Sequence, residues 1–215
     1  MNAVYVEEEI YVNNKVYLVT GEKLKYLTAY FNSNLFNYFL EKDTSNLGGK
    51  GEKYMNEIYV FFPNTEIEKS FSVSIDMIQN SYREKEIICK SLINYLNSQF
   101  NLEKPSKKLQ NWHELTFADF IKELNKAIKA ANRAAAKAAV IDLGDPSGQM
   151  ETTPYQVIPE LTKKDEFEWM ELFEEKKKEV VELQSQINQT EKEIDQMVYE
   201  LYGLTDEEIG IVEGS

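Results

Sequence analysis

The chain has 215 residues, of which 42% are hydrophobic and 12% aromatic, and its formal net charge is -13. This length and apolar content allow one sizeable folded domain or two small ones, and they exclude an intrinsically disordered chain. The single cysteine excludes an internal disulfide framework and suits a reducing compartment. No apolar run of the sequence is long enough to span a membrane. The composition therefore predicts a cytoplasmic protein with no membrane partner.

The negative charge is unevenly distributed along the chain. Residues 71–140 carry a net charge of +4, whereas residues 160–215 carry -11. DNA phosphates favour a basic surface, so the acidic C-terminal segment is expected to lie away from any bound nucleic acid. The overall charge weakens a DNA-binding hypothesis without removing it, because a less acidic face is available elsewhere.

The N-terminal part alternates in the manner of β-strands. Apolar residues alternate over 4–12 and 16–20, on either side of Asn13-Asn14, a pair that suits a tight hairpin turn. A buried strand is predicted over 58–62, where Pro63 ends it.

Between these strands the period changes. From Lys23 to Glu41 the apolar residues recur at three and four, which predicts an amphipathic helix. A polar, glycine-rich loop over 43–51 follows it. We therefore predict an α+β fold, with a small mixed α/β recognition head over residues 1–70.

The remainder, residues 71–215, is predicted to form a long antiparallel, coiled-coil-like helical arm. Its helices are expected at about 75–100, 116–140 and 162–202. A linker rich in proline and glycine, residues 141–159, separates the last two. Thr162 is a plausible N-cap of the final helix, and Gly203 is expected to end it.

The final helix carries a strict heptad seam. One interpretation is an intramolecular core with the seam over Phe117–Ala138. The other is a surface that docks a partner helix or forms a homo-oligomer. The candidate docking residues are Phe173, Val180, Ile187, Ile194, Met197, Val198 and Leu201.

Catalytic motifs do not emerge from the sequence. It contains no Pro-Pro pair of the kind that holds a flipped adenine for methylation, and no glycine fingerprint of a cofactor-binding fold. The single histidine, His113, is expected to have no Cys partner and to be a packing or capping residue. Cys89, among Ile87, Ile88 and Leu92, is predicted to be a core thiol. We predict no enzymatic activity for the chain alone, and no cofactor, metal site or catalytic residue.

Three stretches resemble target-recognition regions of bacterial restriction–modification proteins. They are Tyr17–Leu27, Lys107–Leu115 and Ile194–Thr205, which closes the last helix. The likeness is to the TaqI-like C-terminal specificity domain of type IIG enzymes and to the DNA-specificity subunits of type I systems. The resemblance implies a component that selects a DNA sequence for a site-specific adenine methyltransferase or restriction enzyme.

The same resemblance points to the glycine-rich loop from Asn46 to Tyr54 as the DNA contact. Glycine lets the backbone approach phosphates, and lysine supplies charge. At Glu52 and Lys53 the sequence departs from the family, where an aromatic residue followed by Arg is common, so these positions lack the Arg fork that reads guanine. The alternative is a solvated connection between helix and strand. The candidate DNA-binding residues are Asn46, Gly48, Gly49, Lys50, Gly51, Lys53 and Tyr54.

Two functions from different classes therefore stand as predictions. The first is a target-recognition component that binds double-stranded DNA together with a methyltransferase or restriction domain or subunit. The second is a helical assembly protein that docks or oligomerises through its coiled coil and does not bind DNA directly.

Overall fold

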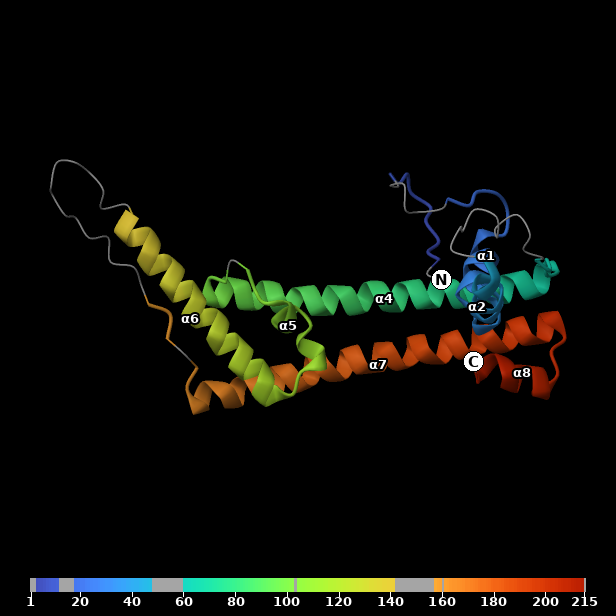
Figure 1. The fold of residues 1–215 in the computed structure, drawn as a ribbon. Coiled ribbons are helices and arrows are strands. Elements are labelled where there is room, and N and C mark those ends of the chain that lie inside the picture. Colours follow the sequence, from blue (N-terminus) through green and yellow to red (C-terminus); the bar gives the residue numbers. More distant parts are fainter. Residues whose placement is uncertain are drawn as a thin grey trace. The chain divides into compact units, whose positions relative to one another are not determined.

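The computed structural model describes residues 3–11, 18–47, 60–102, 104–141, 157–159 and 161–214. All regular structure in these ranges is helical, and none of them contains a β-strand (Figure 1). The predicted α+β fold with a mixed α/β head is therefore wrong.

The alternating N-terminal segment fails to form strands because its described backbone bonds to helix side chains instead of to a second strand. The Ala3 N–H donates to Asn32 Oδ1 at 2.8 Å, and Asn32 Nδ2 donates to the Ala3 carbonyl at 2.8 Å. Gln79 Nε2 donates to the Tyr5 carbonyl at 2.8 Å. Alternation makes a strand possible, but a strand also needs a partner edge. The predicted turn at Asn13-Asn14 and the first half of the strand over 58–62 lie outside the described residues.

The described part of the chain contains seven α-helices and one 3-10 helix. Their bounds are α1 Leu24–Asn32, α2 Asn34–Leu47, α4 Thr65–Phe100, α5 Lys107–Gln110, the short 3-10 helix Trp112–Glu114, α6 Phe117–Ile141, α7 Lys163–Tyr202 and α8 Asp206–Glu213. None of the helices in the described part of the chain combines the length and apolar character that crossing a bilayer requires.

The single helix predicted over Lys23–Glu41 is divided in two at Ser33. This residue has extended backbone, and its hydroxyl donates to the Tyr30 carbonyl at 2.7 Å while accepting from the Phe36 N–H at 3.3 Å. Serine hydroxyls compete in this way with helical hydrogen bonds, which explains why a continuous 3.6-residue period gives two helices.

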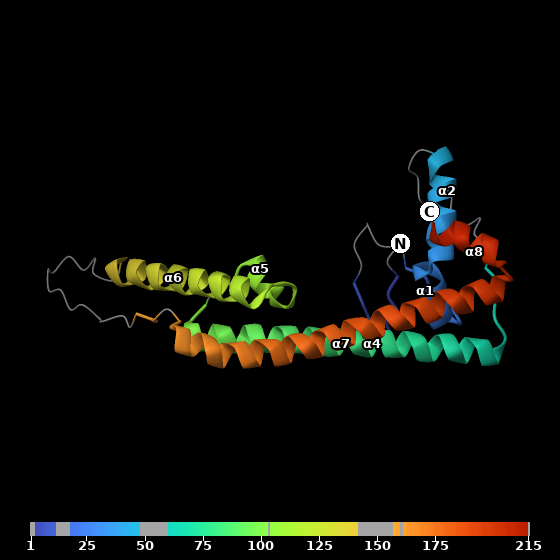
Figure 2. The ribbon, with the colours of Figure 1, turned by 90° about the horizontal axis from the view of Figure 1, so that it is seen from below.

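The chain forms two compact units, and the long helices α4 and α7 contribute to both. Unit 1 comprises residues 1–81 and 185–215, and unit 2 comprises residues 82–184. In unit 2, α4 and α7 run antiparallel, since Lys85 bonds to Gln184 while Tyr95 contacts Trp169. Figure 2 shows α5 and α6 together on one side of this part of the pair.

Unit 1 is built around an aromatic core. Tyr26 and Tyr30 of α1 are fully buried, and Tyr26 meets the ring of Phe71 edge-on at 5.1 Å. The ring of Tyr30 stacks on Tyr202 of α7 at 5.3 Å with an interplanar angle of 6°. Offset aromatic contacts of this kind add to the free energy of burial. The buried residues of this core are Tyr26, Ala29, Tyr30, Phe31, Leu35, Phe36, Phe71, Ile75, Ile194, Val198, Tyr199 and Val212.

The closing segment Ile194–Thr205 holds unit 1 together through long-range contacts. Asp195 Oδ1 accepts the Asn34 N–H at 2.7 Å, at the first residue of α2. The Tyr202 hydroxyl accepts the Phe61 N–H at 3.2 Å. Burial raises the pKa of Asp195, and the hydrogen bond from Asn34 opposes that rise. One carboxylate thus satisfies a donor that the α2 terminus leaves without an intrahelical partner.

The end of α7 confirms the predicted stop at Gly203. This residue has φ +68°, its N–H donates to the Glu200 carbonyl at 3.1 Å, and the Leu204 N–H donates to the Tyr199 carbonyl at 3.0 Å. These are the two bonds of a Schellman motif. Thr205 then caps α8 through a capping box with Glu208, an element that was not predicted from the sequence.

Candidate functional site

The most pronounced charge pattern in unit 2 is a row of cations along α6. Five basic residues recur at intervals of four, three, four and four, and all are exposed. At 100° per residue this spacing keeps them on one side of the helix, over about 22 Å of its length. We call this row the α6 basic stripe: Lys122, Lys126, Lys129, Arg133 and Lys137.

The opposite side of α6 is held in the core, which fixes the direction of the stripe. Phe120, Leu124 and Ile128 are fully buried. Phe120 packs on Phe173 of α7 with ring centroids 4.9 Å apart. Since these residues lie about half a turn from the stripe, α6 stands between its own cations and the acidic helix α7.

Helix α6 itself contributes few acidic groups beside the stripe. Within α6 only Asp119 and Glu123 are acidic, and Glu123 forms a long ion pair with Lys126 at 3.9 Å. By contrast, α7 carries six lysines and twelve acidic residues. A local positive field on an acidic protein can attract a polyanion, because salt limits the range over which exposed charges act to about 10 Å at moderate ionic strength. Acidic groups farther away than this weaken the field of the stripe little.

Helix α5 adds two further cations beside this surface. Lys107 and Lys108 are exposed, and their helix begins at the N-cap Ser106. The Ser106 hydroxyl donates to Glu123 Oε2 at 3.1 Å, and Leu109 is fully buried. The short helix is therefore pinned against α6. The sequence showed the positive charge of residues 71–140, but the arrangement on one helix face was not among its predictions.

The residues predicted to contact DNA lie mostly outside the described ranges. Asn46 falls in the last turn of α2, so the predicted loop begins later than the sequence indicated. The others, Gly48, Gly49, Lys50, Gly51, Lys53 and Tyr54, lie outside the described residues. Their assignment stays a prediction.

The residues predicted to dock a partner lie within the chain's own interior. Phe173 and Val180 belong to the unit 2 core, whereas Ile194 and Val198 belong to the unit 1 core. Ile187 is fully buried, and Met197 and Leu201 are partly buried against unit 1. These side chains therefore contribute to the packing of the chain itself.

Cys89 and His113 form a pair that the sequence analysis missed. The Cys89 Sγ lies 3.6 Å from His113 Nδ1, so the expectation that His113 has no Cys partner is wrong. Residues 24 apart meet because the Trp112 indole N–H donates to the Cys89 carbonyl at 3.3 Å. Burial raises the pKa of the Cys89 thiol and lowers the pKa of His113. Burial thus favours a neutral thiol beside a neutral imidazole over the ion pair of a reactive cysteine.

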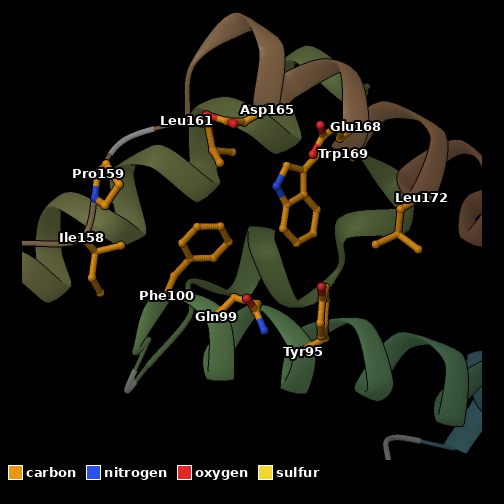
Figure 3. Close-up of a pocket in the computed structure, with 10 residues that line it drawn as sticks. All are labelled: Tyr95, Gln99, Phe100, Ile158, Pro159, Leu161, Asp165, Glu168, Trp169 and Leu172. Carbon is orange, nitrogen blue, oxygen red and sulfur yellow. The ribbon is translucent and has the colours of Figure 1, made fainter.

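A cavity of about 480 Å³ opens at the end of unit 2 (Figure 3). The rings of Phe100 and Tyr95 lie 5.7 and 5.8 Å from the ring of Trp169. Asn132 of α6 holds the segment around Ile158 beside the cavity. Its Nδ2 donates to the Ile158 carbonyl at 2.8 Å, and its Oδ1 accepts the Ile158 N–H at 2.9 Å. The cavity is lined by Tyr95, Gln99, Phe100, Ile158, Pro159, Leu161, Asp165, Glu168, Trp169 and Leu172.

Asp165, in the first turn of α7, lines this cavity and bonds to the predicted N-cap, Thr162. Asp165 Oδ2 accepts the Thr162 N–H at 2.8 Å and the Thr162 hydroxyl at 2.7 Å. These hydrogen bonds lower the pKa of Asp165. In the described part of the chain, no three His, Cys, Asp or Glu side chains gather closely enough to hold a metal ion.

The described residues thus define a helical protein whose long helices α4 and α7 pass through two cores. The model of a family of unknown function, DUF8810, matches residues 64–198, and the chain belongs to that family. The match extends from the start of α4 to the middle of the closing segment in α7. No curated protein and no solved structure matches the chain.

Proposed function

We propose that the chain is a non-catalytic DNA target-recognition component of a bacterial restriction–modification system. It acts in the cytoplasm with a methyltransferase or restriction partner that carries the active site. The observation that carries the DNA-binding part is the α6 basic stripe, because it concentrates five exposed cations on one face of an acidic protein. Phosphate neutralisation by such residues supplies most sequence-independent affinity for DNA.

The restriction–modification part rests on the resemblance of Tyr17–Leu27, Lys107–Leu115 and Ile194–Thr205 to target-recognition regions. In the structure, Ile194–Thr205 joins α7 to α1 and α2 within unit 1, through Asp195 and Tyr202. These contacts give the segment a structural role within unit 1. Base reading would then fall to residues other than the segment that carries the resemblance.

The test is titration of duplex DNA with the wild-type chain and the variant K122E/K126E/R133E, followed by fluorescence anisotropy at several salt concentrations. Wild type is expected to bind, with affinity that falls steeply as salt rises. The variant is expected to bind more weakly and to lose about three units of the log–log salt slope, since each phosphate contact contributes about 0.9.

The matched control is K69E/K90E/K178E, which changes the net charge equally at exposed lysines outside the stripe. Equal loss of affinity in both variants would refute the stripe as the contact surface. A K50E/K53E variant tests the predicted loop in the same assay. Restored or stronger binding on adding a methyltransferase partner would support the restriction–modification assignment.

The second candidate, a helical assembly protein, predicts no DNA affinity at moderate salt and a stable oligomer in sedimentation. The burial of Phe173, Val180 and Ile187 weighs against it, because the heptad seam that would associate is already used within the chain.

A further inference from the structure

The cavity of unit 2 combines aromatic walls with charge of one sign. Three of its ten lining residues are aromatic, and the two ionisable carboxyl groups are those of Asp165 and Glu168. None of the described residues that line it is Lys, Arg or His. An anion would meet two carboxylates and no cation among these lining residues, so the lining disfavours anionic ligands.

The two carboxylates differ in how they are held. Asp165 is fixed by the two hydrogen bonds from Thr162, and Lys164 also contributes to lowering its pKa. Glu168 is exposed and forms no ion pair or hydrogen bond with the described residues. One carboxylate therefore gives the cavity a fixed negative charge, and the other can still turn toward a ligand.

The aromatic rings select the kind of cation. Trp169 contacts the rings of both Tyr95 and Phe100, and Figure 3 shows all three side chains at the cavity. The faces of aromatic rings attract weakly hydrated cations, with tryptophan the strongest. A small metal ion would instead need several oxygen ligands, whereas Ile158, Leu161 and Leu172 present apolar surface.

We propose that this cavity binds an organic ammonium cation, with the charged group beside Trp169 and Glu168 and the apolar body against Ile158 and Leu161. The cavity of about 480 Å³ is within the usual range for small-molecule sites, about 300–1,000 Å³. This site is separate from the α6 basic stripe, and its occupancy does not depend on DNA binding.

The test uses choline as the probe and its neutral analogue, in which a tert-butyl group replaces the trimethylammonium group. The chain has two tryptophans, so a nitrogen–proton correlation spectrum shows two indole signals, which Trp169→Phe assigns. Choline is expected to shift the Trp169 signal and to leave the signal of the fully buried Trp112 unchanged. The neutral analogue is expected to bind at least about fivefold more weakly.

Two variants separate charge from shape. Glu168→Gln keeps the size of the side chain and is expected to weaken choline binding about fivefold, and Tyr95→Leu is expected to weaken it by a similar factor. Glu171→Gln, at an exposed position of α7 that does not line the cavity, is the control and is expected to change nothing. Equal binding of choline and the neutral analogue, or no shift with either, would overturn the proposal.

A further binding experiment identifies the source of the ammonium group. A peptide with trimethyl-lysine that binds more tightly than choline supports a ligand carried on a partner protein. Binding of choline without binding of the peptide supports a free small molecule. Neither binding experiment involves DNA, so failure of the stripe variants and failure of this site are distinguishable.

Discussion

Replacement of Phe173 by alanine tests whether the heptad seam of α7 is internal or is a docking surface. Phe173 is 1% exposed, and its ring lies 4.9, 5.5 and 5.8 Å from the rings of Phe120, Phe117 and Trp112. Lys177 Nζ lies 5.4 Å from the Phe173 ring centroid. The substitution removes all of these contacts from the centre of the unit 2 core.

The expected loss of unfolding free energy is about 4 kcal/mol. Large-to-small changes of a buried phenylalanine cost about 3–5 kcal/mol, because the transfer free energy is lost and a cavity remains. Each aromatic pair contributes about 0.5–1.5 kcal/mol beyond area burial, which places this site in the upper part of that range. Alanine has a slightly higher helix propensity than phenylalanine, and this difference offsets a few tenths of a kcal/mol of the loss.

Urea unfolding followed by tryptophan fluorescence measures this loss, since both tryptophans, Trp112 and Trp169, lie in unit 2. The control is Phe167→Ala on the same helix, whose ring is 61% exposed and which is expected to change stability by about 0.5 kcal/mol or less. The control shares the helix-propensity change, so the difference between the variants reports burial. A Phe173→Ala loss below about 1.5 kcal/mol, together with a change in self-association, would refute an internal seam.

Three further predictions concern local features of the two units. Gly203→Ala is expected to destabilise the protein by about 1 kcal/mol in thermal melts, because φ is +68° and no atom lies within 4 Å of an added Cβ, so backbone strain acts alone; unchanged or increased stability would contradict this. Burial lowers the pKa of His113, so the unfolded chain takes up a proton at this residue at a higher pH than the folded chain does. The contribution of His113 to the free energy of unfolding is therefore fully present above about pH 6.5 and decreases as the pH falls below that value. His113→Gln should remove that decrease, and comparing the two proteins cancels the opposite contributions of Asp195 and Glu191, whose pKa values burial raises; identical pH profiles would show that His113 contributes nothing. Cys89 is expected to react slowly with iodoacetamide at neutral pH and faster in urea, because burial raises its pKa; equal rates in both would mean that the thiol is not protected.

The periodicity of the sequence located much of the helical structure. The segments predicted as helices over 75–100, 116–140 and 162–202 lie largely within α4, α6 and α7, and the cap residues Thr162 and Gly203 mark the ends of α7. Helical periods and caps depend on residues within about four positions of one another, so the local sequence is enough to predict them.

The contacts that define the candidate sites join residues far apart in the sequence. The α6 basic stripe could have been found by plotting the charges of 117–141 on a helix, since the signal is local. The aromatic cavity could not, because its walls come from α4, from α7 and from the segment around Ile158. The same holds for the meeting of Cys89 with His113.

The sequence by itself determined the helical periods of α4, α6 and α7, the capped ends of α7 and the uneven charge of the chain. Only the tertiary structure decided that the alternating N-terminal residues bond to helix side chains, and that the heptad seam lies within two cores. It also decided that Asp195 caps α2 from 161 residues away. The physical reason is that helical hydrogen bonds and caps form between near neighbours, whereas a strand, a core or a cavity depends on which distant surface becomes its partner.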